Sequence, residues 1–224
     1  MNKAIREQIP NNLLFRYRIP CRKVVAKSKK STTPKPVELD ESYRLPHFGE
    51  FDDQFQFADV RIGWSERGVH VTIIVKGRQM ALECRETAIL DSDSLYLWID
   101  TRNTHDVHRA TRFCHWFVLL PAGGGAKKNK PVANPVKINR AKEVSPSFNR
   151  SKVLIESEVS KSGYKINALI PAASLNGWNP EEQTDIGFNF MVNDSELGYQ
   201  TLALGPDMPI EEDPSLWHTL QLVE

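Results

Sequence analysis

Hydrophobic and polar residues alternate along much of the chain with the period of two that is typical of β-strands. The two clearest segments, 59–64 and 69–75, are rich in β-branched residues. Between them, residues 65–68 form a hairpin-sized turn that ends in glycine. The pattern predicts a β-hairpin over residues 59–75.

Further segments of the same kind follow along the chain, at 94–100, 113–120, 153–159, 164–170, 186–193, 199–204 and 219–223. Convincing helical periodicity is missing apart from a turn at 171–175. Many short strands with turn residues between them predict an all-β fold, an antiparallel β-sandwich, with a barrel as the alternative. The stretch 121–149 contains three consecutive glycines and a group of lysines, and is predicted to be a long exposed loop.

The amino-terminal part of the chain is basic. Residues 1–30 carry nine Lys or Arg and one acidic residue. Within them, residues 15–21 alternate apolar or aromatic side chains with Arg16, Arg18 and Pro20, which favours an amphipathic strand laid on the main domain. A nucleic-acid or membrane-surface arm is the alternative. We therefore divide the chain into a basic strand and linker, 1–36, and a sandwich domain, 37–224.

Composition supports one folded domain with a core, because 40% of the 224 residues are hydrophobic and 25% are charged. Lys and Arg number 29 against 28 Asp and Glu. This balance argues against a nucleic-acid partner, since such proteins neutralise many phosphates. The apolar runs are far shorter than the roughly 20 residues of a membrane-spanning helix, so no membrane association is expected.

Residues 1–20 lack the apolar core of a secretory signal. Cys21, Cys84 and Cys114 are an odd number of cysteines without a CxxC pair, which argues against a disulfide framework or a zinc knuckle. Both observations favour a cytoplasmic location.

The motifs of common enzymes are missing. The sequence contains no GxSxG, HExxH or CxxC, and the run 123–130 lacks the G-K-[ST] ending of a phosphate loop. Asp91 and Asp93, with the acids at 211–213, are the carboxylates available for a glycosidase pair, although solvated acids beside strand ends are the simpler interpretation. Asp91, Asp93 and Asp194 are also candidate ligands of a loose calcium site, and calcium is the one cofactor that these residues suggest. Tyr96 excludes an EF-hand, because that position needs glycine.

The densest polar cluster is the segment 100–115. Its histidines, carboxylates and Cys114 are groups that bind transition metals. Its donors also suit a loop that contacts the hydroxyls or carboxylates of a ligand. A hydrogen-bonded structural loop is the third interpretation.

Trp98 is the tryptophan that strand alternation singles out. The alternation that buries Leu95, Leu97 and Ile99 sends Tyr96 and Trp98 to the opposite face. Aromatic rings beside hydrogen-bonding groups suit sugars, whose C–H faces pack on rings. The alternative is that both faces of this strand are covered and Trp98 belongs to a core.

Five blocks occur in an order that resembles the family 9 carbohydrate-binding modules, within the wider group of DOMON-like sandwiches. They are FADVRIGWSERGVHVTIIVKG (57–77), DSDSLYLWIDTRN (91–103), SGYKINALIPAASL (162–175), DIGFNFMVND (185–194) and DPSLWHTLQL (213–222). Together they cover most of residues 37–224.

The resemblance implies a non-catalytic, jelly-roll type antiparallel sandwich that binds sugars and accompanies O-glycosyl hydrolases in carbohydrate breakdown. In the family, two tryptophans clamp the sugar; the corresponding positions here are near Leu90 and Glu211, which are not aromatic. The family's polar contacts match the outward face of the strand 94–100, the region 114–116, and Asn189. Asp194 matches a position that holds a loop or an ion.

We therefore expect a carbohydrate or small polar ligand without catalysis. The candidate ligand-binding residues are Tyr96, Trp98, Arg102, Asn103, His105, His108, Arg112, His115, Trp116 and Asn189. One alternative is a structural or protein-interaction module that kept the fold and lost the sugar clamp, with a protein partner held by the loops 101–112 and 121–149. Another is a metal- or haem-binding DOMON-like domain that uses His105, His108, His115 or Met191.

Overall fold

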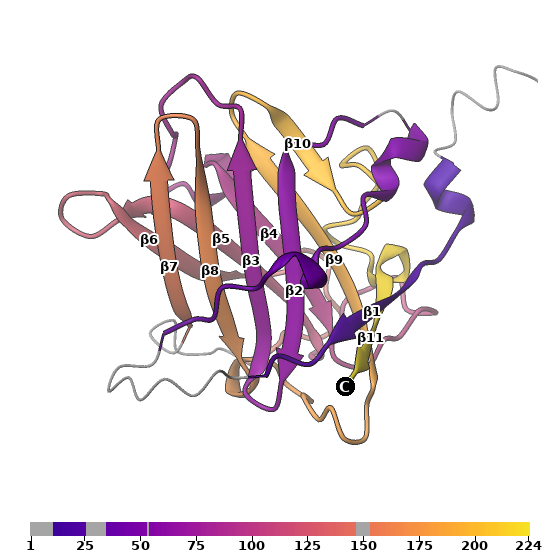
Figure 1. The fold of residues 1–224 in the computed structure, drawn as a ribbon. Coiled ribbons are helices and arrows are strands. Elements are labelled where there is room, and N and C mark those ends of the chain that lie inside the picture. Colours follow the sequence, from indigo (N-terminus) through magenta and orange to yellow (C-terminus); the bar gives the residue numbers. More distant parts are fainter. Residues whose placement is uncertain (1–10, 26–34, 53, 147–152) are drawn as a thin grey trace, which may run out of the picture.

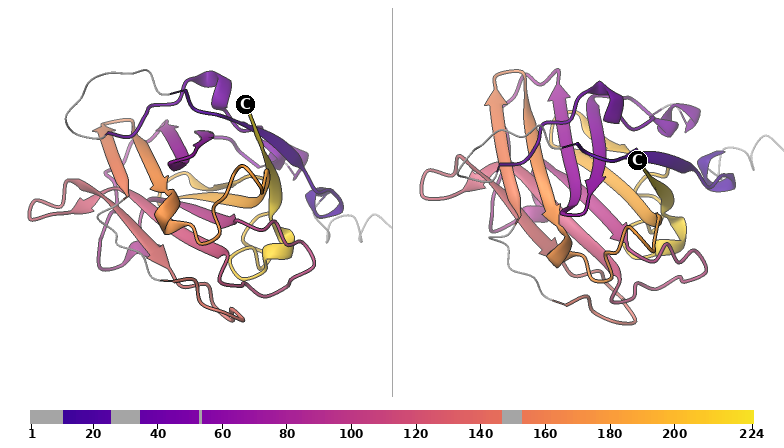
Figure 2. Two further views of the ribbon diagram at one scale, coloured as in Figure 1. Left: turned by 90° about the horizontal axis from the view of Figure 1, so that it is seen from below. Right: turned by 60° about the horizontal axis from the view of Figure 1, so that its bottom comes forward.

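The structure, a computed structural model, describes residues 11–25, 35–52, 54–146 and 153–224 (Figure 1). The predicted linker, residues 27–36, therefore lies outside the described residues except for its last two positions. The described chain forms two β-sheets packed face to face (Figures 1 and 2). This confirms the predicted all-β sandwich.

Sheet A is the larger of the two, with the strand order β1-β11-β9-β4-β5-β6 and with β10 paired to the second half of β9. Its strands are β1 (Arg18–Arg22), β4 (Ser94–Asp100), β5 (Cys114–Gly124), β6 (Lys130–Val136), β9 (Asp185–Asp194), β10 (Gly198–Thr201) and β11 (His218–Val223). Sheet B has the order β2-β3-β8-β7, with β2 (Ala58–Ser65), β3 (Gly68–Lys76), β7 (Leu154–Ser160) and β8 (Gly163–Pro171).

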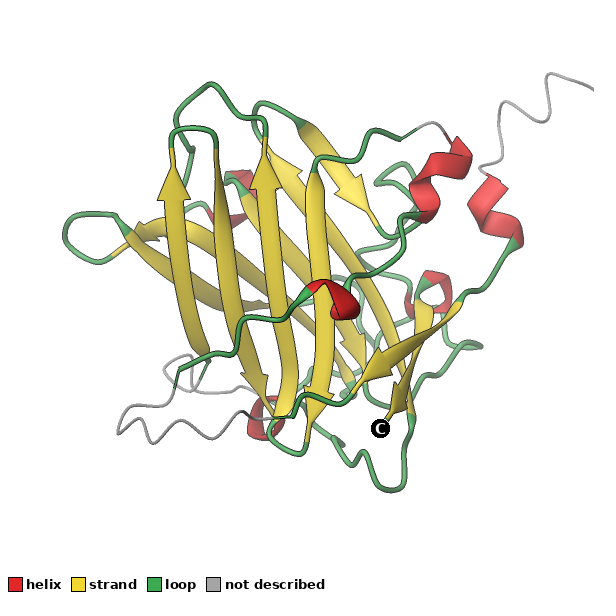
Figure 3. Ribbon diagram, viewed as in Figure 1, coloured by secondary structure: helices red, strands yellow, loops and turns green. Residues whose placement is uncertain are grey.

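The helical elements in the described residues are short 3₁₀ turns between strands (Figure 3). They are η1 (Asn11–Leu14), η2 (Glu41–Tyr43), η3 (Phe48–Asp52), η4 (Ile89–Asp91), η6 (Ala172–Ser174) and η7 (Pro214–Leu216). The turn predicted at 171–175 is η6. Nowhere in the part of the chain that the structure describes is there a helix long and apolar enough to cross a membrane.

The main core lies between the two sheets and follows the predicted alternation. Leu97 on β4, Ile73 on β3 and Phe188 on β9 are fully buried members of it. Burying a side chain of this size stabilises the fold by about 1.5–3 kcal/mol. The same alternation directs the intervening side chains of these strands to the opposite, outer face of sheet A.

That outer face carries a second apolar cluster, which includes Tyr96, Trp98 and Trp116. Side chains from three irregular segments, 101–113, 137–146 and 203–217, pack against these rings. The molecule therefore has a third layer of loops over sheet A. This layer determines whether the aromatic side chains are accessible to a ligand.

The prediction of a long loop over 121–149 is wrong for residues 121–136, whereas the described residues 137–146 are irregular as predicted. β5 continues to Gly124 and pairs with β6, and the turn between them contains Gly125 and Lys128, both with positive φ. Pro131 and Pro135 hid β6 in the sequence, because proline interrupts the hydrogen-bond ladder of an inner strand. Here β6 is the last strand of sheet A, where prolines are tolerated.

The opposite edge of sheet A is formed by the basic amino-terminal segment. β1 pairs in parallel with β11, and the backbone N–H of Lys23 extends the ladder by donating to the Val223 carbonyl at 2.9 Å. The segment predicted as a strand laid on the domain is thus a strand of the sandwich itself.

A strap over 35–45 crosses the outer face of sheet B (Figure 1). Its Leu39 is buried, and the Leu39 N–H donates to Thr72 Oγ1 at 2.9 Å while its carbonyl accepts from Arg61 at 2.9 Å. Both outer faces of the sandwich are therefore partly covered by irregular chain.

Candidate functional site

The aromatic part of the candidate site lies at the centre of sheet A. Trp98 on β4 is directly opposite Trp116 on β5 and Asn189 on β9. The Trp98 and Trp116 ring centroids are 5.5 Å apart, and the Tyr96 ring lies 5.7 Å from Trp116. The sheet therefore brings four predicted ligand residues onto one face.

The third layer buries these residues. Tyr96 is 4% exposed, Trp98 is 0% exposed and Trp116 is 4% exposed, and Asn189 is also buried. The expectation of an open aromatic platform at Trp98 is wrong, because the loops 101–113, 137–146 and 203–217 pack on it. The alternative interpretation, in which Trp98 belongs to a core, describes this structure.

Asp100, at the end of β4, shapes the polar loop that follows. Its carboxylate accepts hydrogen bonds from the backbone N–H groups of Arg102, at 2.9 Å, and Thr104, at 2.7 Å. Asn103 between them has a φ of 52°, in the left-handed region that asparagine tolerates better than most residues. The loop is thus a tight, carboxylate-held turn.

The polar residues of this loop are divided between structural and exposed roles. His105 Nε2 lies 3.0 Å from Thr219 Oγ1, and that hydroxyl lies 3.2 Å from Asn103 Oδ1. Because Oδ1 only accepts, Thr219 donates to it and His105 donates from Nε2. Burial, helped by the charge of Arg16, lowers the pKa of His105. His105 and Asn103 therefore tie the loop to β11.

Three other predicted residues are exposed at the same end. Arg102 and Arg112 both stack on the ring of Phe113, at 4.8 and 5.1 Å. The exposed His108 lies 3.1 Å from the Asp213 carboxylate. These side chains are accessible hydrogen-bond donors, although each already has a partner.

His115 is separated from the Trp98 face. It stacks against Phe117, and its Nδ1 lies 2.9 Å from Ser145 Oγ. Burial lowers the pKa of His115 to about 4, so the ring is neutral at pH 7. With Trp116 it lines a pocket of ≈ 160 Å³ beneath the segment 137–146.

The two positions that correspond to the family's clamp lie near Tyr96. The Tyr96 hydroxyl donates to the Leu90 carbonyl at 2.7 Å, and the Leu90 side chain is 45% exposed. Glu211 is half-buried, and burial together with the charge of Glu212 raises its pKa. Leu90, Tyr96 and Glu211 form what we call the rim, an accessible edge of the covered aromatic cluster.

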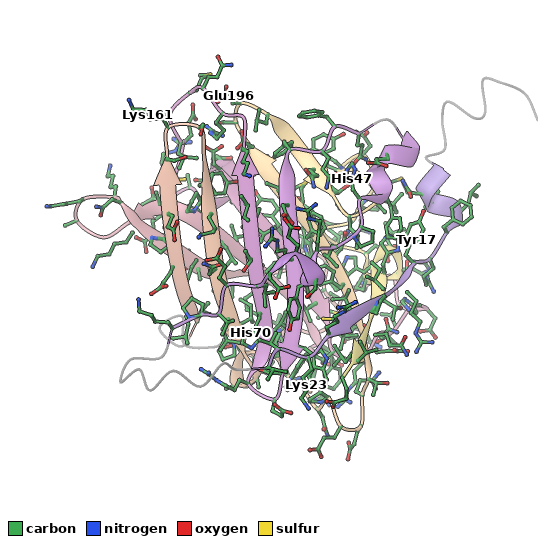
Figure 4. All side chains as sticks on the ribbon, viewed as in Figure 1. Tyr17, Lys23, His47, His70, Lys161 and Glu196 are labelled. Carbon is green, nitrogen blue, oxygen red and sulfur yellow. The ribbon has the colours of Figure 1, made fainter. Side chains whose placement is uncertain are left out.

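The acids proposed for calcium do not form one cluster. Asp93 and Asp194 are buried on either side of the Arg78 guanidinium, whereas Asp91 is at the exposed end of η4. Glu196, which marks this end of the sandwich in Figure 4, lies 3.9 Å from the same guanidinium. Calcium stays a prediction, and this buried cation counts against it.

The described residues contain no group of three or more His, Cys, Asp and Glu side chains placed to hold a metal ion. Of the residues predicted as alternatives for haem or metal, His105, His108 and His115 each contact different partners, and Met191 lies in the outer-face cluster. Asp93, buried against Arg78, is also badly placed for a glycosidase pair. Sequence reasoning missed Arg78, because nothing in the pattern near it signals a buried charge.

No family model matches the chain, and no curated protein matches it. Several solved structures do match it. A family 9 carbohydrate-binding module from Caldicellulosiruptor kristjanssonii, in complex with glucose, superposes with a TM-score of 0.62 at 15% identity, over 92% of this chain and 96% of that one. Its complex with cellotriose gives 0.60 at 14% identity, over 92% and 93%.

A protein from Bacteroides uniformis, described as a proposed carbohydrate-binding protein, superposes with a TM-score of 0.57 at 10% identity, over 93% of this chain and all of that one. At such low identities the similarity concerns the fold alone. It confirms the resemblance in the ordered blocks at the level of the fold. This chain has the fold of the family 9 carbohydrate-binding modules.

Proposed function

We propose that this chain is a non-catalytic carbohydrate-binding domain. The observation that carries the proposal is the shared fold, over more than nine-tenths of both chains, with modules solved in complex with glucose and cellotriose. Those sugars belong to the other structures. They nevertheless define the first ligands to test here.

We place the sugar at the rim rather than on Trp98. Leu90 offers an accessible apolar surface, and the Glu211 carboxylate offers acceptors for sugar hydroxyls. Tyr96 lies beneath them with its hydroxyl already bonded to Leu90. Because no tryptophan stands at either position, the stacking that normally strengthens sugar binding is missing, and we expect weak binding.

Restoring aromatic rings at the rim is expected to strengthen sugar binding. The double variant Leu90→Trp/Glu211→Trp should bind cellotriose at least about tenfold more tightly than the parent, since about 1.4 kcal/mol of added stacking suffices. Titration calorimetry with cellotriose and glucose measures the change. Val159→Trp, on the exposed side of β7, is the matched control and should leave the affinity unchanged.

A folded double variant that gives no heat with either sugar would place the site elsewhere. If the parent also stays silent across a broad glycan panel, the carbohydrate proposal itself fails. Circular dichroism of the same samples checks that both proteins are folded.

A second candidate is a protein-interaction module that kept this fold. Two observations favour it: the outer aromatic face is buried, and the clamp positions are not aromatic. Exposed apolar side chains on both sides of β1 are available to a partner, among them Leu14 (69% exposed), Phe15 (58%) and Val25 (79%). Purification of the native protein only as a free monomer would count against this candidate.

A further inference from the structure

An accessible aromatic ring lies on the outer face of sheet A, beside the covered cluster. Met191 on β9 belongs to that outer-face cluster. β10 pairs with β9 at this place, with Thr201 opposite Met191 and Tyr199 opposite Asn193 (Figure 1). Paired side chains share one face of a sheet, and so do side chains two residues apart on a strand. Tyr199 therefore points to the same outer face as Trp98.

Tyr199 differs from the other strand aromatics of this face in its exposure. It is 41% exposed, whereas Tyr96, Trp98 and Trp116 are almost completely buried. The segment 203–217, which covers those rings, meets Tyr199 at Gly205, where a Cβ atom would lie 3.4 Å from the ring carbon Cε2 and from the hydroxyl oxygen. Gly205 thus packs beside the ring without covering it. Among the aromatic side chains that the described strands direct to this face, Tyr199 is the one that a ligand can reach.

Polar groups beside Tyr199 suit the hydroxyls of a sugar. The Asn193 side-chain amide donates from Nδ2 to the Ser92 carbonyl at 3.1 Å, and Ser92 directly follows the η4 turn that carries Leu90. Asn193 Oδ1 accepts no hydrogen bond from the described residues and is not among the fully buried atoms. An amide oxygen accepts hydrogen bonds from hydroxyls. Asn193 is therefore an available acceptor between Tyr199 and the rim.

The third layer also connects Tyr199 with the rim. The segment that meets Tyr199 at Gly205 continues to Glu211, which belongs to the rim. The exposed residues between these two positions are Pro206, Asp207 and Pro209. An accessible surface therefore extends along this segment from the rim to Tyr199.

The strand order gives the width of this surface. Asn193 on β9 lies between Tyr199 on β10 and Ser94 on β4. β10 and β4 are thus two strand spacings apart, or about 10 Å. Tyr96, the rim residue on β4, is on the far side of β9 from Tyr199. One pyranose ring is too short to contact both ends, whereas a chain of three rings can.

We propose that Tyr199 stacks on one ring of an oligosaccharide that extends from the rim, past the Asn193 amide, to β10. The inference rests on the proposed sugar binding at the rim, and it adds a stacking residue outside the two clamp positions. The C–H face of a sugar packs on the Tyr199 ring, and a hydroxyl donates to Asn193 Oδ1. This contact partly replaces the missing tryptophans and selects an oligosaccharide over a single sugar.

Titrations of the ¹⁵N-labelled full chain with glucose and cellotriose test the proposal by NMR, because chemical shifts report weak binding. Cellotriose should bind the parent about tenfold more tightly than glucose. Tyr199→Ala should remove this advantage and leave the glucose affinity unchanged, whereas Tyr199→Phe, which keeps the ring, should retain it. Phe15→Ala, another exposed aromatic position, is the matched control and should change neither affinity.

Equal affinities of the parent for the two sugars would overturn the inference. A folded Tyr199→Ala variant that still prefers cellotriose to the same extent would overturn it as well. Either result leaves the proposed function standing, since sugar still binds. If the glycan panel identifies another sugar, its monomer and trimer take the place of glucose and cellotriose. If no glycan binds the parent, the proposed function fails, and this inference fails with it.

Discussion

Arg78→Met is expected to lower the free energy of unfolding at pH 7 by about 3–5 kcal/mol, the usual cost of removing one partner of a buried ion pair. The Arg78 side chain is 1% exposed and contacts the carboxylates of Asp93, at 3.2 Å, and Asp194. Both carboxylates are fully buried, so the variant would leave two negative charges without their cation. Urea unfolding followed by fluorescence measures the loss.

The matched control is Lys76→Met, which removes a positive charge from the exposed end of β3 and should change stability by less than about 0.5 kcal/mol. Adding Asp93→Asn and Asp194→Asn to Arg78→Met should recover part of the loss, because the uncompensated charges are then gone. Equal stability of Arg78→Met and the parent would show that this network contributes nothing.

Mild acid is expected to destabilise the protein strongly through three buried histidines. Burial lowers the pKa of His70, His115 and His218 to about 4, against about 6.5 in an unfolded chain. Between these values the unfolded chain binds more protons, so stability falls as the pH drops from 6.5 towards 4 and is fully present above 6.5. Protonation of each histidine lowers the free energy of unfolding by about 3 kcal/mol at most.

The sum approaches the roughly 5–15 kcal/mol that stabilises a typical domain, so we expect unfolding at mildly acidic pH. Free energies of unfolding at a series of pH values between 7.5 and 4 measure the slope. His70→Gln should flatten it, because a glutamine amide can reach Ser65, which lies 2.8 Å from His70 Nε2, without titrating. The control His108→Gln, at an exposed position, should leave the slope of stability against pH unchanged. A slope unaffected by His70→Gln would contradict this account.

Most of the strands were predictable because one face of each is buried. The hairpin of β2 and β3 alternates cleanly, and its turn ends at Gly68, where φ is 130°. β6 could not be predicted, since Pro131 and Pro135 mark an edge strand only when the strand order is known. The parallel pairing of β1 with β11 was equally out of reach, because it joins segments far apart in the sequence.

The sequence predicted which face of sheet A carries the candidate site, but not the layer of loops that covers this face. Alternation correctly put Tyr96 and Trp98 on the outer face of sheet A. It could not show that Ile210 and Trp217 would pack over them, since the segments that carry these residues lack a periodic pattern. For the same reason no sequence pattern indicated that Arg78 would join Asp93 and Asp194.

The pairing of β1 with β11 also determines how the domain resists mechanical load. The two strands run in the same direction, with Arg18 opposite Thr219 and Arg22 opposite Val223. A force that pulls the amino-terminal end of β1 and the carboxy-terminal end of β11 in opposite directions slides one strand past the other. All the evenly spaced hydrogen bonds of a parallel ladder then share the force at once, instead of opening one after another. Pulled through these two strands, the domain is loaded in shear, the direction in which a sheet is hardest to tear.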